Sequence, residues 1–365
     1  MAAAGTTRRL KLGVLALTLL GGAVAVWLVL RGGLGPVLAA LRSVGWVGFG
    51  VVCAWQLGLT ALLAAAWQVV APGAPLRRFG DFCWARLARD AAAEVLPLAP
   101  VGAMVVGSRA LVLRGWPVAL ALGSLMAAVT AEMAAQVVYA LASIGLLVQR
   151  LSASGPGAAP GSSHVAGLHL VAPLLAGSAV GAATVAGFYL AQRRGLGVAQ
   201  AVAGRWLPKA AGQAAAVSEV VAAIYARPVR MAASFVAHLL AWAVTAGASW
   251  VALGFIGARL GFVQVFALEG LLYALRSAAF FVPGALGVQE AGYTLMGPLF
   301  GLSVEAGLAL SLLRRARDIA LGVPVVLIWQ ALESRAGLSA PVLSARPSTE
   351  TGAGREGAGQ GARRP

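Results

Sequence analysis

Long apolar runs separated by arginine-rich segments constrain this chain more than any other feature of its sequence. Hydrophobic residues make up 60% of the sequence and charged residues only 11%, which is more apolar surface than one water-soluble core could bury. In lipid every backbone N–H and C=O needs an internal partner, and long unbroken runs favour helices over the short alternating strands of a barrel. We therefore predict an all-α, polytopic integral membrane protein.

Six apolar runs are predicted to cross the bilayer completely, because each approaches or exceeds the roughly 20 residues that a crossing needs. They are Leu12–Leu30, Val44–Ala71, Pro117–Val148, Leu168–Ala191, Met231–Ile256 and Ser303–Leu332. Loops rich in Lys and Arg stay in the cytoplasm, and this rule places both termini there. Of the basic residues between runs, only four then lie on the opposite side: Arg31, Arg42, Arg150 and Arg259.

The same pattern predicts three regions along the chain. Residues 1–11 are a cytoplasmic N-terminus, and residues 12–333 form a single integral membrane domain. Residues 334–365 are rich in Gly, Ser, Pro and Arg and cannot bury enough apolar area to fold. We expect them to be a disordered cytoplasmic tail.

Several functional classes find no support in the composition. The net charge of +16 is spread between the apolar runs and forms no basic patch with interleaved aromatics, so nucleic acid is not an expected partner. The two cysteines and three histidines, including His238, form no metal-binding pattern, and we assign the histidines no chemistry. No Walker or Rossmann context surrounds the glycines, so neither a metal nor a cofactor is expected. The tryptophans mostly lie toward the ends of the apolar runs and are interpreted as membrane-interface anchors.

Two segments interrupt the pattern of plain crossings. The first, residues 86–109, contains Glu94, Pro97 and Arg109, and the second, residues 269–290, has helix breakers in the middle of an apolar stretch. Such breaks are tolerated at membrane depth only inside protein or beside water, so we expect re-entrant or broken helices that line a cavity. In the predicted topology they enter from opposite sides, as in inverted repeats around a transport site, although their sequence similarity is weak.

A charged cluster lies near the middle of the last apolar run. Arg314, Arg315, Arg317 and Asp318 follow one another there, and each charge costs at least about 2.5 kcal/mol on insertion scales. Arg314 and Asp318 are one helical turn apart and are expected to pair. The other two arginines would then face an anionic ligand or other acids. The acids available within or beside apolar runs are Glu132, Glu269 and Glu290.

Two interpretations of this cluster remain open. In the first interpretation the charges have only a structural role: they form buried ion pairs, or they lie at the point where the last run divides into two shorter helices. Alternatively they line a polar path for a lipid headgroup, anionic or sugar-like, whose tails stay in the bilayer; Arg276 and Glu269, two turns apart, would belong to that path. The cluster also repeats the pattern Arg-x-Ala-Arg-Asp of residues 86–90, which coincidence explains as readily as duplication.

The broken segments and the cluster together resemble a known family. The pattern Pro283-Gly284-x-x-Gly287-x-x-Glu290 and the run Arg-Ala-Arg-Asp at 315–318 resemble the lysylphosphatidylglycerol synthase transmembrane superfamily. Its first signature is similar to Glu94, Pro97 and Arg109, except that Leu98 stands where relatives usually have glycine. The run from Arg276 to Gln330 is most similar to the branch of hopanoid biosynthesis-associated membrane proteins.

The resemblance implies a lipid flippase-like or transporter-like protein of the bacterial inner membrane. Its expected partners are membrane lipids, hopanoid-like or anionic, and lipid-synthesis enzymes. It is not expected to be an enzyme, since the sequence after Glu333 leaves no room for the soluble aminoacyl-transferase domain of the synthases. Two alternatives remain: an intramembrane lipid-modifying enzyme with Glu94, Glu132 or Glu290 as general base, and a scaffold for lipid-synthesis enzymes.

Overall fold

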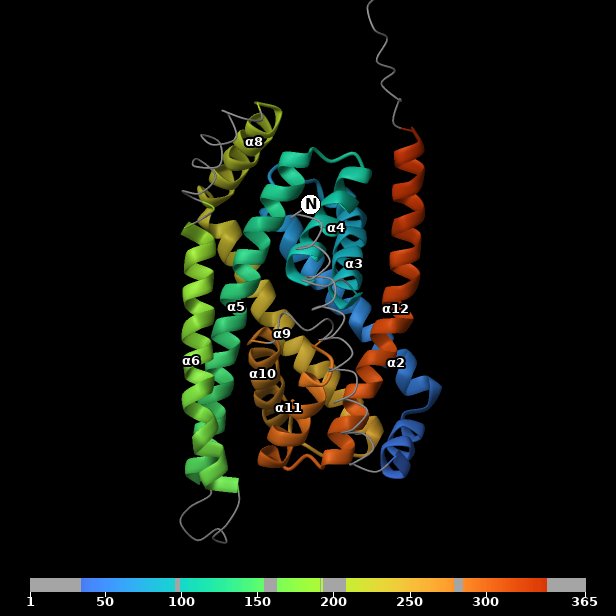
Figure 1. Ribbon diagram of the computed structural model, residues 1–365, viewed down its shortest axis with the longest axis vertical. Coiled ribbons are helices and arrows are strands. Elements are labelled where there is room, and N and C mark those ends of the chain that lie inside the picture. The colour runs from blue at the N-terminus through green and yellow to red at the C-terminus, as the bar shows by residue number, and fades with distance from the viewer. Residues whose placement is uncertain are drawn as a thin grey trace, which may run out of the picture.

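The computed structural model describes residues 34–95, 99–153, 163–190, 192, 208–278 and 285–339. Over these residues the chain is helical with no strand (Figure 1), which confirms the all-α prediction. The α-helices are α2 (Leu34–Val70), α3 (Phe79–Val95), α4 (Ala99–Leu113), α5 (Val118–Ala153), α6 (Ser163–Leu190), α8 (Pro208–Tyr225), α9 (Pro228–Ile256), α10 (Phe262–Ala278), α11 (Val288–Met296) and α12 (Val304–Ser339).

Three of the described helices are long and apolar enough to cross a membrane. They are Leu38–Val70 in α2, Val118–Leu151 in α5 and Pro228–Ile256 in α9, and each coincides with a predicted crossing. The first predicted crossing lies outside the described residues. The chain is therefore a multi-pass membrane protein. Helices α6 and α12 cover the remaining two predicted runs but are not among these three helices, so the count of six crossings stays a prediction.

Two pairs of short helices correspond to the predicted broken segments. Helices α3 and α10 have 17 residues each, which gives them a length of about 25 Å, less than the roughly 30 Å of hydrocarbon. Only residues 96–98 separate α3 from α4, and the two helices pack along each other. Figure 1 shows α3 and α4 in one half of the molecule and α10 and α11 in the other. The two hairpins therefore lie at opposite ends of the molecule, and their entry from opposite sides of the bilayer stays a prediction.

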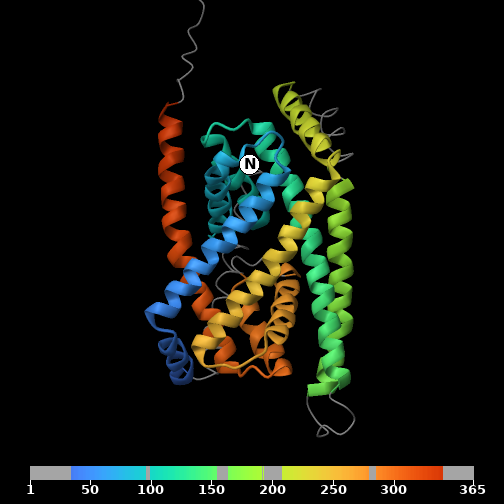
Figure 2. The same cartoon turned by 180° about the vertical axis from the view of Figure 1, so that it is seen from behind.

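The order of helix lengths occurs twice. Helices α2 to α5, which we name the first unit, have 37, 17, 15 and 36 residues, and α2 is divided by a kink at Gly45. Helices α9 to α12, the second unit, have 29, 17, 9 and 36 residues. In both units a long helix is followed by two short helices and another long one. The second unit runs in the opposite direction, and Figure 2 shows α2 and α9 lying side by side with their chain directions opposed.

Each hairpin packs into its own apolar core. In the first unit Trp67, Phe82 and Trp116 meet edge to face, with ring centroids 5.7 and 5.4 Å apart. In the second unit Leu271 and Tyr293 belong to a separate buried cluster. Edge-to-face aromatic packing and apolar burial hold each hairpin against the long helices beside it.

Helix α12 is one continuous helix from Val304 to Ser339 with Pro324 inside it. The alternative in which the last run divides into two shorter helices at the charged cluster is therefore wrong. The helix also continues past Glu333 into the segment predicted to be a tail; residues 340–365 lie outside the described part of the chain.

Candidate functional site

A cavity of about 230 Å³ lies where the two units meet. Helices α2, α3, α5, α9, α10 and α12 all contribute to its wall. Its charged lining residues are Arg86, Asp90, Glu94, Glu132, Arg276, Arg314, Arg317 and Asp318. The volume is below the several hundred Å³ of pockets that enclose whole drug-sized ligands, so it suits a small polar group better than an entire lipid.

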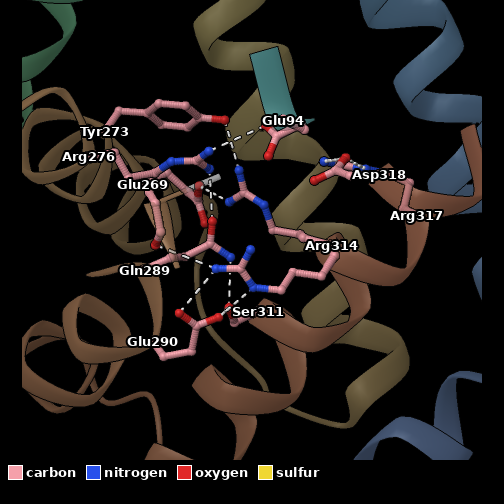
Figure 3. A network of polar contacts seen from close by, with 12 residues as sticks. Glu94, Glu269, Tyr273, Arg276, Gln289, Glu290, Ser311, Arg314, Arg317 and Asp318 are labelled. Carbon is pink, nitrogen blue, oxygen red and sulfur yellow. Dashed lines mark hydrogen bonds and ion pairs between the residues drawn. The ribbon is translucent and has the colours of Figure 1, made fainter. Parts of the chain in front are cut away.

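Arg314 is held by a buried network on the wall formed by the second unit. Its guanidinium donates to Glu269 Oε2 at 2.6 Å and to the Tyr273 hydroxyl at 2.8 Å (Figure 3). It also donates to the Tyr293 hydroxyl at 3.0 Å. The Glu269 side chain is fully buried. The predicted pair between Arg314 and Asp318 is wrong, because Arg314 reaches the acid on α10 and Asp318 accepts from Arg317 at 2.7 Å.

Glu290 has a structural role behind the cavity wall. Its Oε2 accepts the Gly287 N–H at 2.9 Å and so caps the N-terminus of α11, where Gly287 has φ +77°, a conformation that glycine adopts without strain. Its Oε1 accepts from Ser311 at 2.9 Å and from Arg315 at 2.7 Å. The glycine and glutamate of the Pro-Gly-x-x-Gly-x-x-Glu pattern thus shape the hairpin and tie it to α12.

Gln289 connects this cap to the cavity. Arg276 Nη1 donates to Gln289 Oε1 at 2.8 Å, and Gln289 Nε2 donates to Ser311 at 2.8 Å. Arg276 also lies 3.5 Å from Glu94 on α3. Figure 3 shows this series of contacts from Glu94 through Arg276 to Gln289, so the tips of both hairpins are joined through Arg276.

A second ionic cluster lies on the wall formed by the first unit. Arg86 donates to Asp90 at 3.0 Å and to Glu132 at 3.0 Å, and Arg89 donates to Glu132 at 2.8 Å. The repeated Arg-x-Ala-Arg-Asp pattern therefore places both of its copies on one cavity. Arg86, Arg89 and Asp90 were absent from the predicted site, although that repeat was the signal that could have found them.

The acids and the arginines that line the cavity differ in the exposure of their side chains. The side chains of Asp90, Glu94 and Asp318 are 32%, 36% and 25% exposed. Those of Arg86, Arg314 and Arg317 are 7%, 7% and 9% exposed. The three most exposed charged side chains of the wall are consequently carboxylates, and three of its arginines lie largely beneath the surface.

The structure brings most of the predicted site residues together. Those that line the cavity are Glu94, Glu132, Arg276, Arg314, Arg317 and Asp318; those directly behind it are Glu269, Gly287, Glu290 and Arg315. Arg109 is away from the cavity lining and pairs with Glu333 at 2.8 Å near the end of α12. Pro97, Pro283 and Gly284 lie outside the described residues.

Other cavity residues gave no usable signal in the sequence. Tyr273, His238 and Trp242 also line the cavity, although His238 was assigned no chemistry and Trp242 was interpreted as a membrane-interface anchor. Among the described residues, no three metal-binding side chains of the His, Cys, Asp and Glu types come together. The site is therefore built from ion pairs, hydroxyls and aromatic rings.

Comparison with known proteins gives one match. No curated protein and no solved structure matches the chain. The family model described as "Lysylphosphatidylglycerol synthase TM region" matches residues 12–325, which include both hairpins and the charged cluster of α12. The chain therefore belongs to the lysylphosphatidylglycerol synthase TM region family.

Proposed function

We propose that this membrane protein of lipid metabolism moves a polar lipid from one leaflet to the other without making or breaking covalent bonds. The observation that carries the proposal is the ionic cavity between two hairpins that lie at opposite ends of the molecule. A charged, partly open cavity among apolar helices is the kind of compartment that lets a polar head cross hydrocarbon.

The arrangement of the two units supports transport. Their helix lengths follow the same order while their directions are opposite, as in transporters built from inverted repeats with a binding site between them. Arg276 joins the two hairpin tips through Glu94 and Gln289. A change in this contact would open the cavity toward one end or the other, with the lipid tails remaining in the bilayer.

The state of the acids favours transport over catalysis. Glu132 accepts hydrogen bonds from two arginines, and Glu290 from Arg315, Ser311 and the Gly287 amide. A general base needs a lone pair directed at the substrate proton, and these carboxylates already direct theirs at protein donors. Glu94 is more open, so the enzymatic alternative rests on that residue.

For the cargo we propose a hopanoid or another lipid with a polar head. The resemblance of residues 276–330 to the hopanoid-associated branch supports this choice, and the small cavity is consistent with a lipid whose head alone enters the protein.

The test is a leaflet-exposure assay with the purified full chain in phosphatidylcholine vesicles. Lipids with a fluorescent group on the head are reduced from outside with dithionite, and the rate at which inner-leaflet label becomes accessible is followed. We expect a faster rate than in protein-free vesicles, a severalfold reduction for Glu94→Gln, and no change for Arg109→Ala, whose ion pair lies away from the cavity lining.

Two outcomes would contradict the proposal. One is an equal rate with and without protein for zwitterionic, anionic and sugar-headed probes alike. The other is a probe lipid that changes mass when it is incubated with the protein, with the change abolished by Glu94→Gln, which would establish the enzymatic alternative.

A further inference from the structure

The α9 wall of the cavity holds two polar groups that the ion pairs leave unused. His238 and Trp242 are four residues apart on α9 and both line the cavity. Residues at this spacing occupy the same face of a helix. Over the described part of the chain, His238 Nε2 and Trp242 Nε1 are buried and have no hydrogen-bond partner.

The hydrogen-bond role of His238 follows from its other nitrogen. His238 Nδ1 lies 2.8 Å from the backbone carbonyl oxygen of Ser234. A carbonyl oxygen only accepts, so Nδ1 carries the proton and Nε2 of the neutral ring presents a lone pair. The side chain of His238 therefore offers an acceptor.

Trp242 offers the complementary group. An indole Nε1–H can only donate. The ring is held in place by stacking on Tyr139 at 5.5 Å between centroids and by an edge contact with Tyr273 at 4.6 Å. Because burying an unpaired donor or acceptor costs about 1–3 kcal/mol, the two groups together indicate a partner that both donates and accepts.

The charges of the cavity argue against a partner with a net charge. Its described lining holds four arginines and four acids, and each of these groups has an ionic partner in the protein. A charged ligand would have to break one of these pairs and leave its other member uncompensated in a poorly solvated place. A neutral hydroxyl both accepts and donates and requires no such loss.

We infer that the cavity binds an uncharged, hydroxyl-bearing group such as a sugar or polyol, with one hydroxyl accepting from Trp242 Nε1–H and donating to His238 Nε2. This inference rests on the proposed function for the source of that group, the head of a transported lipid. Gln56 and Thr60 on α2 also line the cavity and supply further hydrogen-bonding groups for other hydroxyls.

The binding test uses the full chain in detergent and titrates its thermal unfolding midpoint with a short-chain glucosyl-diacylglycerol. We expect a concentration-dependent rise in the midpoint, no rise with the per-O-methylated lipid, and a weaker rise with methyl glucoside, which lacks the tails. Equal stabilisation by the glucosyl and methylated lipids would overturn the inference, and this comparison leaves the protein itself unchanged.

Variants then assign the binding to the two side chains. Trp242→Phe keeps an aromatic ring in the stack and removes the donor, so we expect apparent affinity to fall about fivefold, the equivalent of one neutral hydrogen bond. Trp250→Phe is the matched control, because Trp250 lies on the same helix and donates instead to the Leu260 carbonyl at 2.9 Å. Unchanged affinity in Trp242→Phe, or an equal fall in Trp250→Phe, would also overturn the inference.

The outcomes separate this inference from the proposed function. Glucosyl-lipid binding that weakens in Trp242→Phe, in a protein that accelerates no leaflet exchange, would leave the hydroxyl site standing and remove the transport proposal. Accelerated exchange of other lipids, without any preference for hydroxyl-bearing heads, would leave the transport proposal standing and remove the hydroxyl site.

Discussion

The first and second units each contain an ion pair between a short helix and a long helix, but the acid and the arginine have exchanged places between the two units. In the first unit the arginines lie on the short helix α3 and their shared acid, Glu132, lies on the long helix α5. In the second unit the acid Glu269 lies on the short helix α10 and Arg314 lies on the long helix α12. In both units an ion pair therefore ties a short helix of the hairpin to the following long helix.

The two units also differ in how completely the ion pair is enclosed. Glu269 is fully buried, whereas the Glu132 side chain is 17% exposed. Arg86 keeps a second acid, Asp90, on its own helix, but Arg314 has Glu269 as its only ion-pair partner within 4.0 Å over the described residues. The two units thus share the placement of an ion pair without sharing the residues that form it, which accounts for the weak similarity of the two broken segments.

The largest predicted effect comes from breaking the buried pair of the second unit. Arg314→Met leaves Glu269 charged and uncompensated, so we expect about 3–5 kcal/mol less stability, measured as unfolding by denaturing detergent in mixed micelles. The double variant Arg314→Met with Glu269→Gln should recover most of that loss. If the double variant were as unstable as the single one, the charge would not be the cause.

A smaller effect is predicted for the matching change in the first unit. Glu132→Gln removes the partner of Arg89, but Arg86 retains Asp90, so we expect a loss of about 1–3 kcal/mol in the same unfolding assay. Asp90→Asn combined with Glu132→Gln should then approach the cost of Arg314→Met. A single Glu132→Gln variant as unstable as Arg314→Met would contradict the difference between the units.

The contact between the two units is predicted to matter for function more than for stability. Glu94 and Arg276 are 3.5 Å apart and partly exposed, so Glu94→Gln should change the free energy of unfolding by less than about 1 kcal/mol. Its leaflet-exchange rate should nevertheless fall severalfold. A rate equal to that of the unmodified protein would remove this contact from the transport path.

The smallest effect is predicted for Arg109→Ala. The side chains of Arg109 and Glu333 are 42% and 35% exposed, and open ion pairs contribute at most about 1 kcal/mol. We expect both stability and leaflet exchange to stay close to those of the unmodified protein. A large loss of exchange would show that the polar path extends from the cavity to the end of α12.

Local patterns predicted much of what the site contains. Charges within an apolar run must find partners, and this identified Glu269, Glu290, Arg314 and Arg315 before any fold was known. The spacing rule nevertheless chose the wrong partner for Arg314, because it considers only neighbours on one helix. Glu269 is far away in sequence but buried beside Arg314, and a buried partner interacts more strongly than an exposed one.

The amino-acid sequence is sufficient to predict an all-α, multi-pass membrane protein, because apolar runs of this length leave lipid as the main solvent and helices as the structure that satisfies the backbone. The packing of the helices places both Arg-x-Ala-Arg-Asp segments on one cavity together with His238 and Trp242, and no pattern in the sequence indicates this. Hydropathy is a property of consecutive residues and can be read directly from the sequence. Pairing across a cavity joins residues that are distant in the sequence, and it depends on how the helices of the two units pack against each other.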